Sequence, residues 1–161
     1  MERARRHLVA DLGPMEPPAI DLELRHPTEA DAEALAALML DAYIGTIDYD
    51  GEVLDDARAE VAGWIRSGGR SLQHSFVALD GDTMASAILA SIGDGVPLVA
   101  YAMTAASHKG RGLATALMQA TMDSLGAAGY DRVELWVTIG NDPAEGIYER
   151  LGFRDVEAEP A

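Results

Sequence analysis

The chain contains no cysteine. Disulfides, thiolate metal sites and a covalent acyl-cysteine intermediate are therefore excluded together. The histidines at His26, His74 and His108 have no carboxylate at metal-ligand spacing, so no metal site is predicted either.

Long apolar runs are also missing. No stretch approaches the length of a membrane span, and the N-terminus has no apolar segment long enough for a secretory signal. At 161 residues the sequence has the size of one domain with a single core. We therefore expect a cytoplasmic, single-domain protein with no membrane partner.

Basic residues are scarce, because 12 Lys and Arg face 27 Asp and Glu, for a net charge of −15. Broad nucleic-acid binding is excluded, since phosphates would be repelled over most of such a surface. The acidity favours a cationic small molecule or a basic peptide as the partner. An acidic surface that serves solubility is the alternative interpretation, as is a biased genome composition.

The N-terminal segment carries Arg3, Arg5 and Arg6 and several prolines, with only a short apolar stretch at residues 8–10. This composition predicts a flexible leader over residues 1–19, outside a folded domain that covers residues 20–161. A basic arm for nucleic acid is the alternative, and the acidic body disfavours it.

Hydrophobic periodicity predicts mixed α/β structure. Thr28, with Asp31 three residues on, predicts a capped helix start. Asp-Gly turns at residues 80–81 and 94–95 favour an antiparallel meander. The predicted elements are a strand at 20–24, a helix after residue 28, a helix at 54–66, strands at 75–79, 83–92 and 96–104, a helix from residue 113, a strand at 132–139, a helix at 143–150 and a short strand after residue 153.

The most informative stretch is the run Lys-Gly-Arg-Gly-Leu-Ala at residues 109–114, between the strand at 96–104 and a helix. A strand, a glycine-rich turn and a helix start present unpaired backbone N–H groups and a positive dipole end, which suit a phosphate. Gly110 and Gly112 let the main chain approach an anion with no Cβ in the way. The P-loop is excluded because its lysine follows the second glycine, and the Rossmann fingerprint because a third glycine is missing. Simple loop geometry is the alternative.

A second block lies downstream, at Asn141, Ala144, Tyr148 and Gly152-Phe153, after an apolar strand at 133–137. The two blocks resemble, in this order, the Arg/Gln-x-x-Gly-x-Gly/Ala loop and the Asn-x-x-Ala-x-x-x-Tyr-x-x-x-Gly-Phe segment of the GNAT superfamily, the acyl-CoA-dependent N-acetyltransferases. The strong resemblance covers residues 96–153. It departs from the family at residue 109, where lysine replaces Arg or Gln and the planar guanidinium fork is lost.

The resemblance implies a GNAT-like α/β fold, with a mostly antiparallel twisted sheet flanked by helices in the order β-α-α-β-β-β-α-β-α-β. It implies acetyl-CoA as cosubstrate, held by the glycine loop and by a preceding strand that parts from its neighbour. A core methionine at residue 103 and a helix cap at residue 141 are the alternatives. The implied cofactor-binding residues are Met103, Thr104, Lys109, Gly110, Arg111, Gly112, Leu113, Ala114, Thr115 and Asn141.

Two residues are candidates for catalysis. The resemblance implies that Tyr148, a phenol with an ordinary pKa of about 10, gives a proton to the thiolate leaving group. Packing in the apolar face of its helix is the alternative. Glu134 shares a strand face with Trp136 and is a candidate general base, directly or through water. A solvent-facing glutamate is the commoner interpretation.

The connection at residues 41–52 lies where the family places acceptor-binding loops. Its candidate acceptor-binding residues are Tyr43, Asp48, Tyr49 and Glu52, the acids for a cationic amine and the tyrosines for the walls. A solvated loop over packed tyrosines is the alternative.

The C-terminal strand expected of the fold is short or absent in this sequence. Its edge is then open, or covered by the N-terminal segment or by a second chain, which makes a homodimer a hypothesis. The predicted activity is transfer of an acetyl group from acetyl-CoA to a small-molecule or peptide amine, by direct attack in a ternary complex. A non-catalytic acyl-CoA sensor on the same fold is the leading alternative.

Overall fold

The computed structural model describes residues 4–16, 19–67, 71–93 and 95–156. In this part of the chain the strands form one sheet in the order β2-β3-β4-β5-β6-β1-β7. The strands are β1 (Arg5–Asp11), β2 (Glu23–Arg25), β3 (Phe76–Asp80), β4 (Thr83–Ile92), β5 (Pro97–Thr104), β6 (Arg132–Thr138) and β7 (Arg154–Asp155). The α-helices are α1 (Ala32–Tyr43), α2 (Leu54–Arg66), α3 (Leu113–Ala127) and α4 (Asp142–Arg150), with 3-10 turns at 29–31, 72–74 and 106–108.

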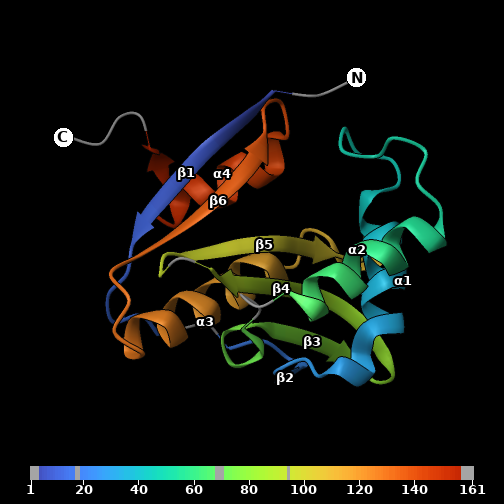
Figure 1. Ribbon diagram of the computed structural model, residues 1–161, viewed down its shortest axis with the longest axis horizontal. Helices are drawn as coiled ribbons and strands as arrows, with labels where there is room; N and C mark the ends of the chain where they lie inside the picture. Colours follow the sequence, from blue (N-terminus) through green and yellow to red (C-terminus); the bar gives the residue numbers. More distant parts are fainter. Residues whose placement is uncertain (1–3, 17–18, 68–70, 94, 157–161) are drawn as a thin grey trace.

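Helices cover both faces of the sheet (Figure 1). Helices α1 and α2 pack on one face, where Leu35, Val61 and Trp64 form a core with the side chains of β3, β4 and β5. Helix α3 packs on the other face with Leu117 and Leu125, and α4 joins this second core. Side chains alternate along the strands in this way because each strand serves two cores.

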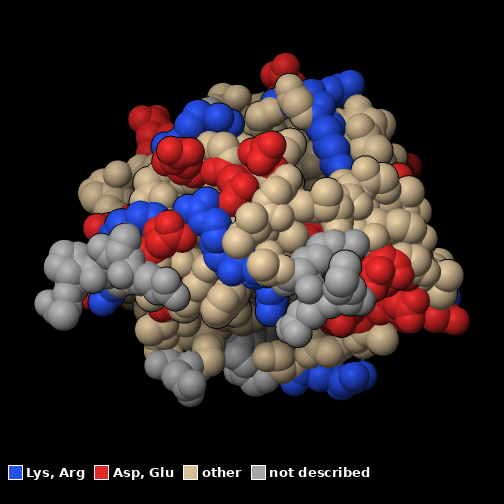
Figure 2. Space-filling model, turned by 90° about the horizontal axis from the view of Figure 1, so that it is seen from above, with Lys and Arg blue, Asp and Glu red and all other residues tan. Residues whose placement is uncertain are grey.

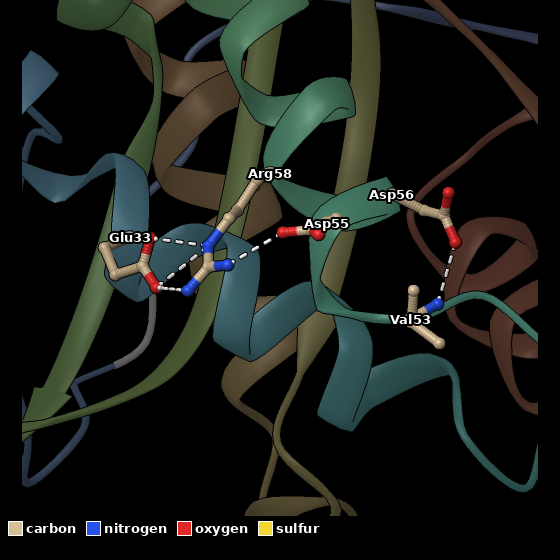
Figure 3. A network of polar contacts seen from close by, with 5 residues as sticks. All are labelled: Glu33, Val53, Asp55, Asp56 and Arg58. Atoms are coloured by element: carbon tan, nitrogen blue, oxygen red, sulfur yellow. Dashed lines mark hydrogen bonds and ion pairs between the residues drawn. The ribbon is translucent and has the colours of Figure 1, made fainter.

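A polar network fixes α2 against α1 (Figure 3). The Arg58 guanidinium donates to both Glu33 carboxylate oxygens on α1 and to the Asp55 carboxylate on α2. Asp56 Oδ2 accepts from the Val53 N–H at 2.8 Å and so caps the start of α2. These contacts hold the two helices that carry the connection at residues 44–53.

The N-terminal segment is a strand of the sheet, so the prediction of a flexible leader outside the folded domain is wrong over residues 5–11. Strand β1 pairs antiparallel with β6 from Arg5 opposite Thr138 to Asp11 opposite Arg132. Its other edge pairs with β7. Leu8, Val9 and Ala10 are buried. Residues 1–3 and 17–18 lie outside the described residues.

Polar partners explain how so basic a segment becomes a strand. The Arg6 guanidinium donates to the Glu145 carboxylate on α4 and to the Asp155 carboxylate on β7. The His7 imidazole contacts the Glu134 carboxylate and stacks on Trp136, with the ring centroids 4.2 Å apart. Strand β1 therefore covers the edge of β6 from within the chain, one of the covers considered above, and an open edge there no longer argues for a dimer.

Strands β5 and β6 touch at one end and then diverge (Figure 1). Their parallel pairing is confined to Leu98 opposite Glu134 and Val99 opposite Leu135. Beyond Val99 the edge of β5 faces a gap, because β6 turns away with β1 beside it. The family resemblance predicted this parting of the strands, and the structure confirms it.

Most element bounds match the prediction. The antiparallel meander of β3, β4 and β5 is confirmed by the register of both pairs. The predicted strand at 20–24 is instead Glu23–Arg25, because only these residues pair with β3. The aspartate of the predicted turn at 94–95 lies outside the described residues.

The strong net acidity is not spread evenly. On the face seen from above, basic side chains lie among the acidic ones (Figure 2). Among the described residues, none of the helices has the length and apolar character that crossing a membrane requires.

Candidate active site

The gap between β5 and β6 opens into a cleft of about 680 Å³. Its apolar floor includes Ile88, Val99, Met118 and Leu135. The start of α3 and the glycine loop border one end of the cleft, which we call the loop end. Residues of the 44–53 connection and the end of β6 border the other, which we call the tyrosine end because Tyr43, Tyr101 and Tyr148 lie there.

The loop end is shaped by backbone conformation. Gly110 and Gly112 have φ values of 81° and 77°, which L side chains rarely adopt. A Cβ added at either glycine would meet no protein atom within 4 Å, so packing does not require glycine there. No side chain caps the start of α3, and Leu113, Ala114 and Thr115 of its first turn line the cleft. This is the geometry that an anion needs at a helix N-terminus.

Two contacts hold the loop in position. His108 Nε2 and Asp80 Oδ2 lie 2.9 Å apart, which ties the loop to the β3–β4 hairpin. Lys109 Nζ donates to the Ala42 carbonyl at the C-terminus of α1, at 2.9 Å. Lys109 lines the cleft, but its ammonium stabilises a helix end as well as facing an anion site.

The cations that line the cleft differ from those predicted. Arg111 is exposed and does not line the cleft, because its side chain leaves the turn between two positive-φ glycines. Arg150, at the end of α4, does line it. Sequence reasoning missed Arg150, although it follows Ile147 by three residues on a helix and so shares its face.

Of the two predicted cofactor-binding residues on β5, one lines the cleft and the other does not. Thr104 lines the cleft, and its hydroxyl lies 2.9 Å from Ser86 Oγ. Met103 does not line the cleft, since its side chain is buried in the core beneath α1 and α2. The core interpretation of Met103, left open above, therefore holds for its side chain.

Tyr148 lies at the tyrosine end of the cleft. Its ring meets the Phe153 ring edge-on, with the centroids 5.7 Å apart, and the Phe153 N–H donates to the Tyr148 carbonyl at 3.0 Å. Burial, and to a lesser extent the charge of Asp48, raises the pKa of Tyr148 to about 12. The phenol is therefore protonated at every ordinary pH.

Asp48 is the predicted acceptor residue that faces the cleft most directly. Its Oδ1 accepts from the Thr138 hydroxyl at 2.5 Å, and its Oδ2 accepts from the Asn141 amide at 3.3 Å. These bonds join the 44–53 connection to the end of β6. Burial and the same carboxylate also raise the pKa of Tyr43, which lines the cleft beside it. Asn141 lies at the tyrosine end, and its side chain does not cap α4.

Tyr49 and Glu52, also predicted as acceptor-binding residues, do not line the cleft. The Tyr49 hydroxyl donates to the Glu52 carbonyl at 3.0 Å, and the Glu52 carboxylate accepts from the Asp50 N–H at 2.8 Å. The connection thus folds on itself and directs these side chains away from the cleft.

Glu134 does not line the cleft either, which removes the geometric basis for its role as general base. Its carboxylate contacts the His7 imidazole on β1. The sequence alone could not reveal this, because the contact requires a strand that was not predicted.

Arg5 is a cleft residue that sequence reasoning missed. Its guanidinium carbon lies 5.5 Å from the centroid of the Trp136 ring. The guanidinium makes no hydrogen bond or ion pair with another described residue. Arg5, His7 and Val9 alternate with other residues at the period of a β-strand. This alternation is the signal that could have predicted β1 and so placed Arg5 in the sheet.

Known proteins agree with this geometry. A sequence profile described as the Acetyltransferase (GNAT) family matches residues 32–153, about three quarters of the chain. The chain belongs to this family. The GNAT fold predicted from the two sequence blocks is confirmed, with the seven-stranded sheet flanked by helices.

Three relatives illustrate the range of this GNAT protein's similarity. N-alpha-acetyltransferase 30 of Schizosaccharomyces pombe is 37% identical over 86 residues, which are 50% of this chain and 57% of that protein. Mycothiol acetyltransferase of Beutenbergia cavernae is 34% identical over 134 residues, 80% of this chain and 43% of that protein. The chain therefore spans about half the length of these curated relatives.

The third relative is a solved structure, the PaiA N-acetyltransferase of Thermoplasma acidophilum in complex with coenzyme A. It has a TM-score of 0.69 at 14% identity and covers 84% of this chain and 91% of that chain. At this identity the likeness shows the fold alone.

The residues present fit coenzyme A. The uncapped start of α3 and the positive-φ glycines suit its diphosphate, and Lys109 of the loop supplies positive charge. The unpaired edge of β5 and the apolar floor suit its pantetheine arm. Within the described ranges, no group of three or more His, Cys, Asp or Glu side chains could hold a metal ion.

Proposed function

We propose that this protein transfers an acetyl group from acetyl-CoA to a primary amine. The observation that carries the proposal is the uncapped N-terminus of α3, opening between two diverging strands. The glycine loop binds the diphosphate through backbone N–H groups. The pantetheine arm then extends between β5 and β6, and the thioester lies near Tyr148.

The acceptor amine enters from the tyrosine end. Asp48 attracts it as an ammonium, with its carboxylate already oriented by Thr138 and Asn141. The amine loses a proton to solvent and attacks the acetyl carbon in a ternary complex. The absence of cysteine favours this direct route over an acyl-enzyme.

Tyr148 assists departure of the thiolate. A thiol has a pKa of about 8.5, so a phenol of pKa about 12 holds its proton more tightly than the sulfur does. Its main contribution is therefore a hydrogen bond to the sulfur as negative charge develops. In the balance, the N–C bond forms, the C–S bond breaks, one ammonium proton leaves to solvent and the sulfur acquires another.

Calorimetry with CoA, followed by thiol release with acetyl-CoA and an amine panel, tests the proposal. We expect CoA to bind and at least one amine to release thiol. Binding without thiol release would indicate an acyl-CoA sensor, and absence of binding would exclude both functions.

The substitution Tyr148→Phe tests the role of the phenol. We expect kcat to fall about 100-fold, the effect of losing one positioned donor, with the Kd for CoA unchanged. Because the pKa of Tyr148 is about 12, neither protein should show an alkaline decline in kcat from this group below about pH 11. Unchanged turnover in the variant at saturating acetyl-CoA removes Tyr148 from the mechanism.

A further inference from the structure

The tyrosine end of the cleft carries two opposite charges. Asp48 comes from the connection between α1 and α2, and Arg5 comes from the N-terminal strand. Both line the same cleft. No ion pair joins them, and Arg5 has no hydrogen-bonding partner among the described residues.

Thr138 fixes the separation of these charges. Arg5 is directly opposite Thr138 in the β1–β6 register, so the two side chains project from the same face, with Cβ atoms about 5 Å apart. The Thr138 hydroxyl donates to the Asp48 carboxylate at 2.5 Å. Thr138 is therefore a neighbour of both residues, opposite Arg5 in the sheet and hydrogen-bonded to Asp48.

Arg5 and Arg150 are the arginines that line the cleft, and among the described residues neither pairs with a carboxylate. Arg6, Arg25 and Arg58 each pair with one or more carboxylates. Arg5 instead lies against the Trp136 ring, which is 49% exposed and lines the cleft. Its five N–H donors remain available to a ligand, and a planar guanidinium matches a carboxylate in two parallel hydrogen bonds.

Apolar side chains lie in the same cleft. Ile147 lines it from α4, beside the apolar floor described above. Ile47, next to Asp48 in sequence, is 41% exposed, and its side chain lies against Gly140 beyond the end of β6. An apolar lining suits a ligand with an apolar portion.

We propose that the acceptor is a free α-amino acid with an apolar side chain, whose ammonium binds Asp48 and whose carboxylate binds Arg5. This inference rests on the proposed function and specifies its acceptor. A peptide N-terminus offers Arg5 only a neutral amide, and a polyamine brings a second cation towards it. The net negative charge of the protein thus does not select a cationic acceptor, because the charged side chains that line the cleft are Arg5, Lys109 and Arg150 against Asp48.

Thiol release with matched amines tests this proposal. L-leucine, L-leucinamide and 3-methylbutylamine share one side chain and differ at the carboxylate, and L-phenylalanine and phenethylamine form a second pair. At saturating acetyl-CoA, we expect kcat/KM for the free amino acids to exceed that of the amines without a carboxylate by about 30-fold, the effect of a charge-assisted contact. Mass spectrometry of the products identifies the acetylated nitrogen.

The substitution Arg5→Gln tests whether Arg5 causes the preference for amines that carry a carboxylate. We expect kcat/KM for leucine to fall about 30-fold while that for 3-methylbutylamine changes by less than about 2-fold. Comparison of each amine with itself cancels differences in basicity. Arg5→Lys should restore part of the leucine activity, because the charge remains but the fork is lost. The melting temperature and the Kd for CoA, unchanged in both variants, exclude a folding effect.

Three results would overturn the proposal and leave the acetyltransferase function intact. They are equal use of amines with and without a carboxylate, equal losses on both in Arg5→Gln, and acetylation of other amines but of no amino acid. Absence of CoA binding, by contrast, would remove the proposed function itself.

Discussion

The two ends of the cleft are built in different ways. The loop end comes largely from one continuous stretch, in which the end of β5, two positive-φ glycines and the start of α3 follow each other in sequence. The tyrosine end combines β1, the 44–53 connection and the end of β6, which meet only in the folded chain. One end offers mainly backbone groups and the other mainly side chains.

This difference determines how freely the residues of each end can change in sequence. Backbone N–H groups at a helix start are present in any sequence that forms the turn, so the donor site depends on two glycines and little else. Side chains from three segments can change independently, so the acceptor site can change while the donor site is kept. We infer that the acceptor of a relative is a weak guide to the acceptor of this protein.

The largest effect is expected where the tyrosine end depends on its most distant segment. Leu8 is 3% exposed, and Leu8→Ala should reduce the free energy of unfolding by about 3 kcal/mol. For a chain of this size that lowers the melting temperature by roughly 10 °C. Val96→Ala, at a side chain that is 49% exposed, is the control and should change stability by less than about 0.5 kcal/mol. Equal melting temperatures for both variants would mean that residues 5–11 do not belong to the folded sheet.

The loop end can be tested with two glycines of like conformation. Gly112 and Gly129 have φ values of 77° and 97°, and a Cβ at either meets no protein atom. Each substitution to alanine, Gly112→Ala or Gly129→Ala, should lower the free energy of unfolding by a similar amount, about 1 kcal/mol. Only Gly112→Ala should weaken CoA binding, by about 100-fold, because its Cβ would occupy the space that a phosphate approaches. Calorimetry with CoA on both variants measures this, and similar Kd values would contradict the loop as the diphosphate site.

The smallest effect is expected for Glu134, the candidate general base whose carboxylate contacts His7 in the structure. Glu134→Gln should change kcat by less than about 2-fold, because the side chain contacts His7 outside the cleft. Steady-state kinetics measures this effect, and the fall in kcat of Tyr148→Phe, measured in the same assay, gives the size expected for a catalytic residue. A loss of tenfold or more would restore Glu134 as a general base.

Local signals were enough for several elements. Helix α2 is observed at Leu54–Arg66, the predicted bounds, because Val61 and Trp64 recur on one buried face. Strand β4 likewise matches its prediction at Thr83–Ile92. The loop end was predictable for the same reason, since glycine conformation and helix starts are properties of adjacent residues.

Long-range partners decided what the sequence could not predict. Three of the seven residues of β1 are Arg5, Arg6 and His7, which read as a solvated leader without their partners. Arg6 finds two carboxylates more than a hundred positions away. In the 44–53 connection, the Tyr49 hydroxyl donates to the Glu52 carbonyl, a contact that the sequence pattern does not predict. Such contacts produce no periodic pattern in the sequence from which they could be predicted.

The pairing of β1 with β6 also sets an order of events during synthesis. His7 and Glu134 are separated by 127 positions, so β1 leaves the ribosome long before β6, the strand with which it pairs, has been synthesised. The meander of β3, β4 and β5, with α3 after it, can assemble earlier from neighbouring segments. A nascent chain would thus acquire its diphosphate-binding turn first and complete its acceptor pocket last, when β6 emerges.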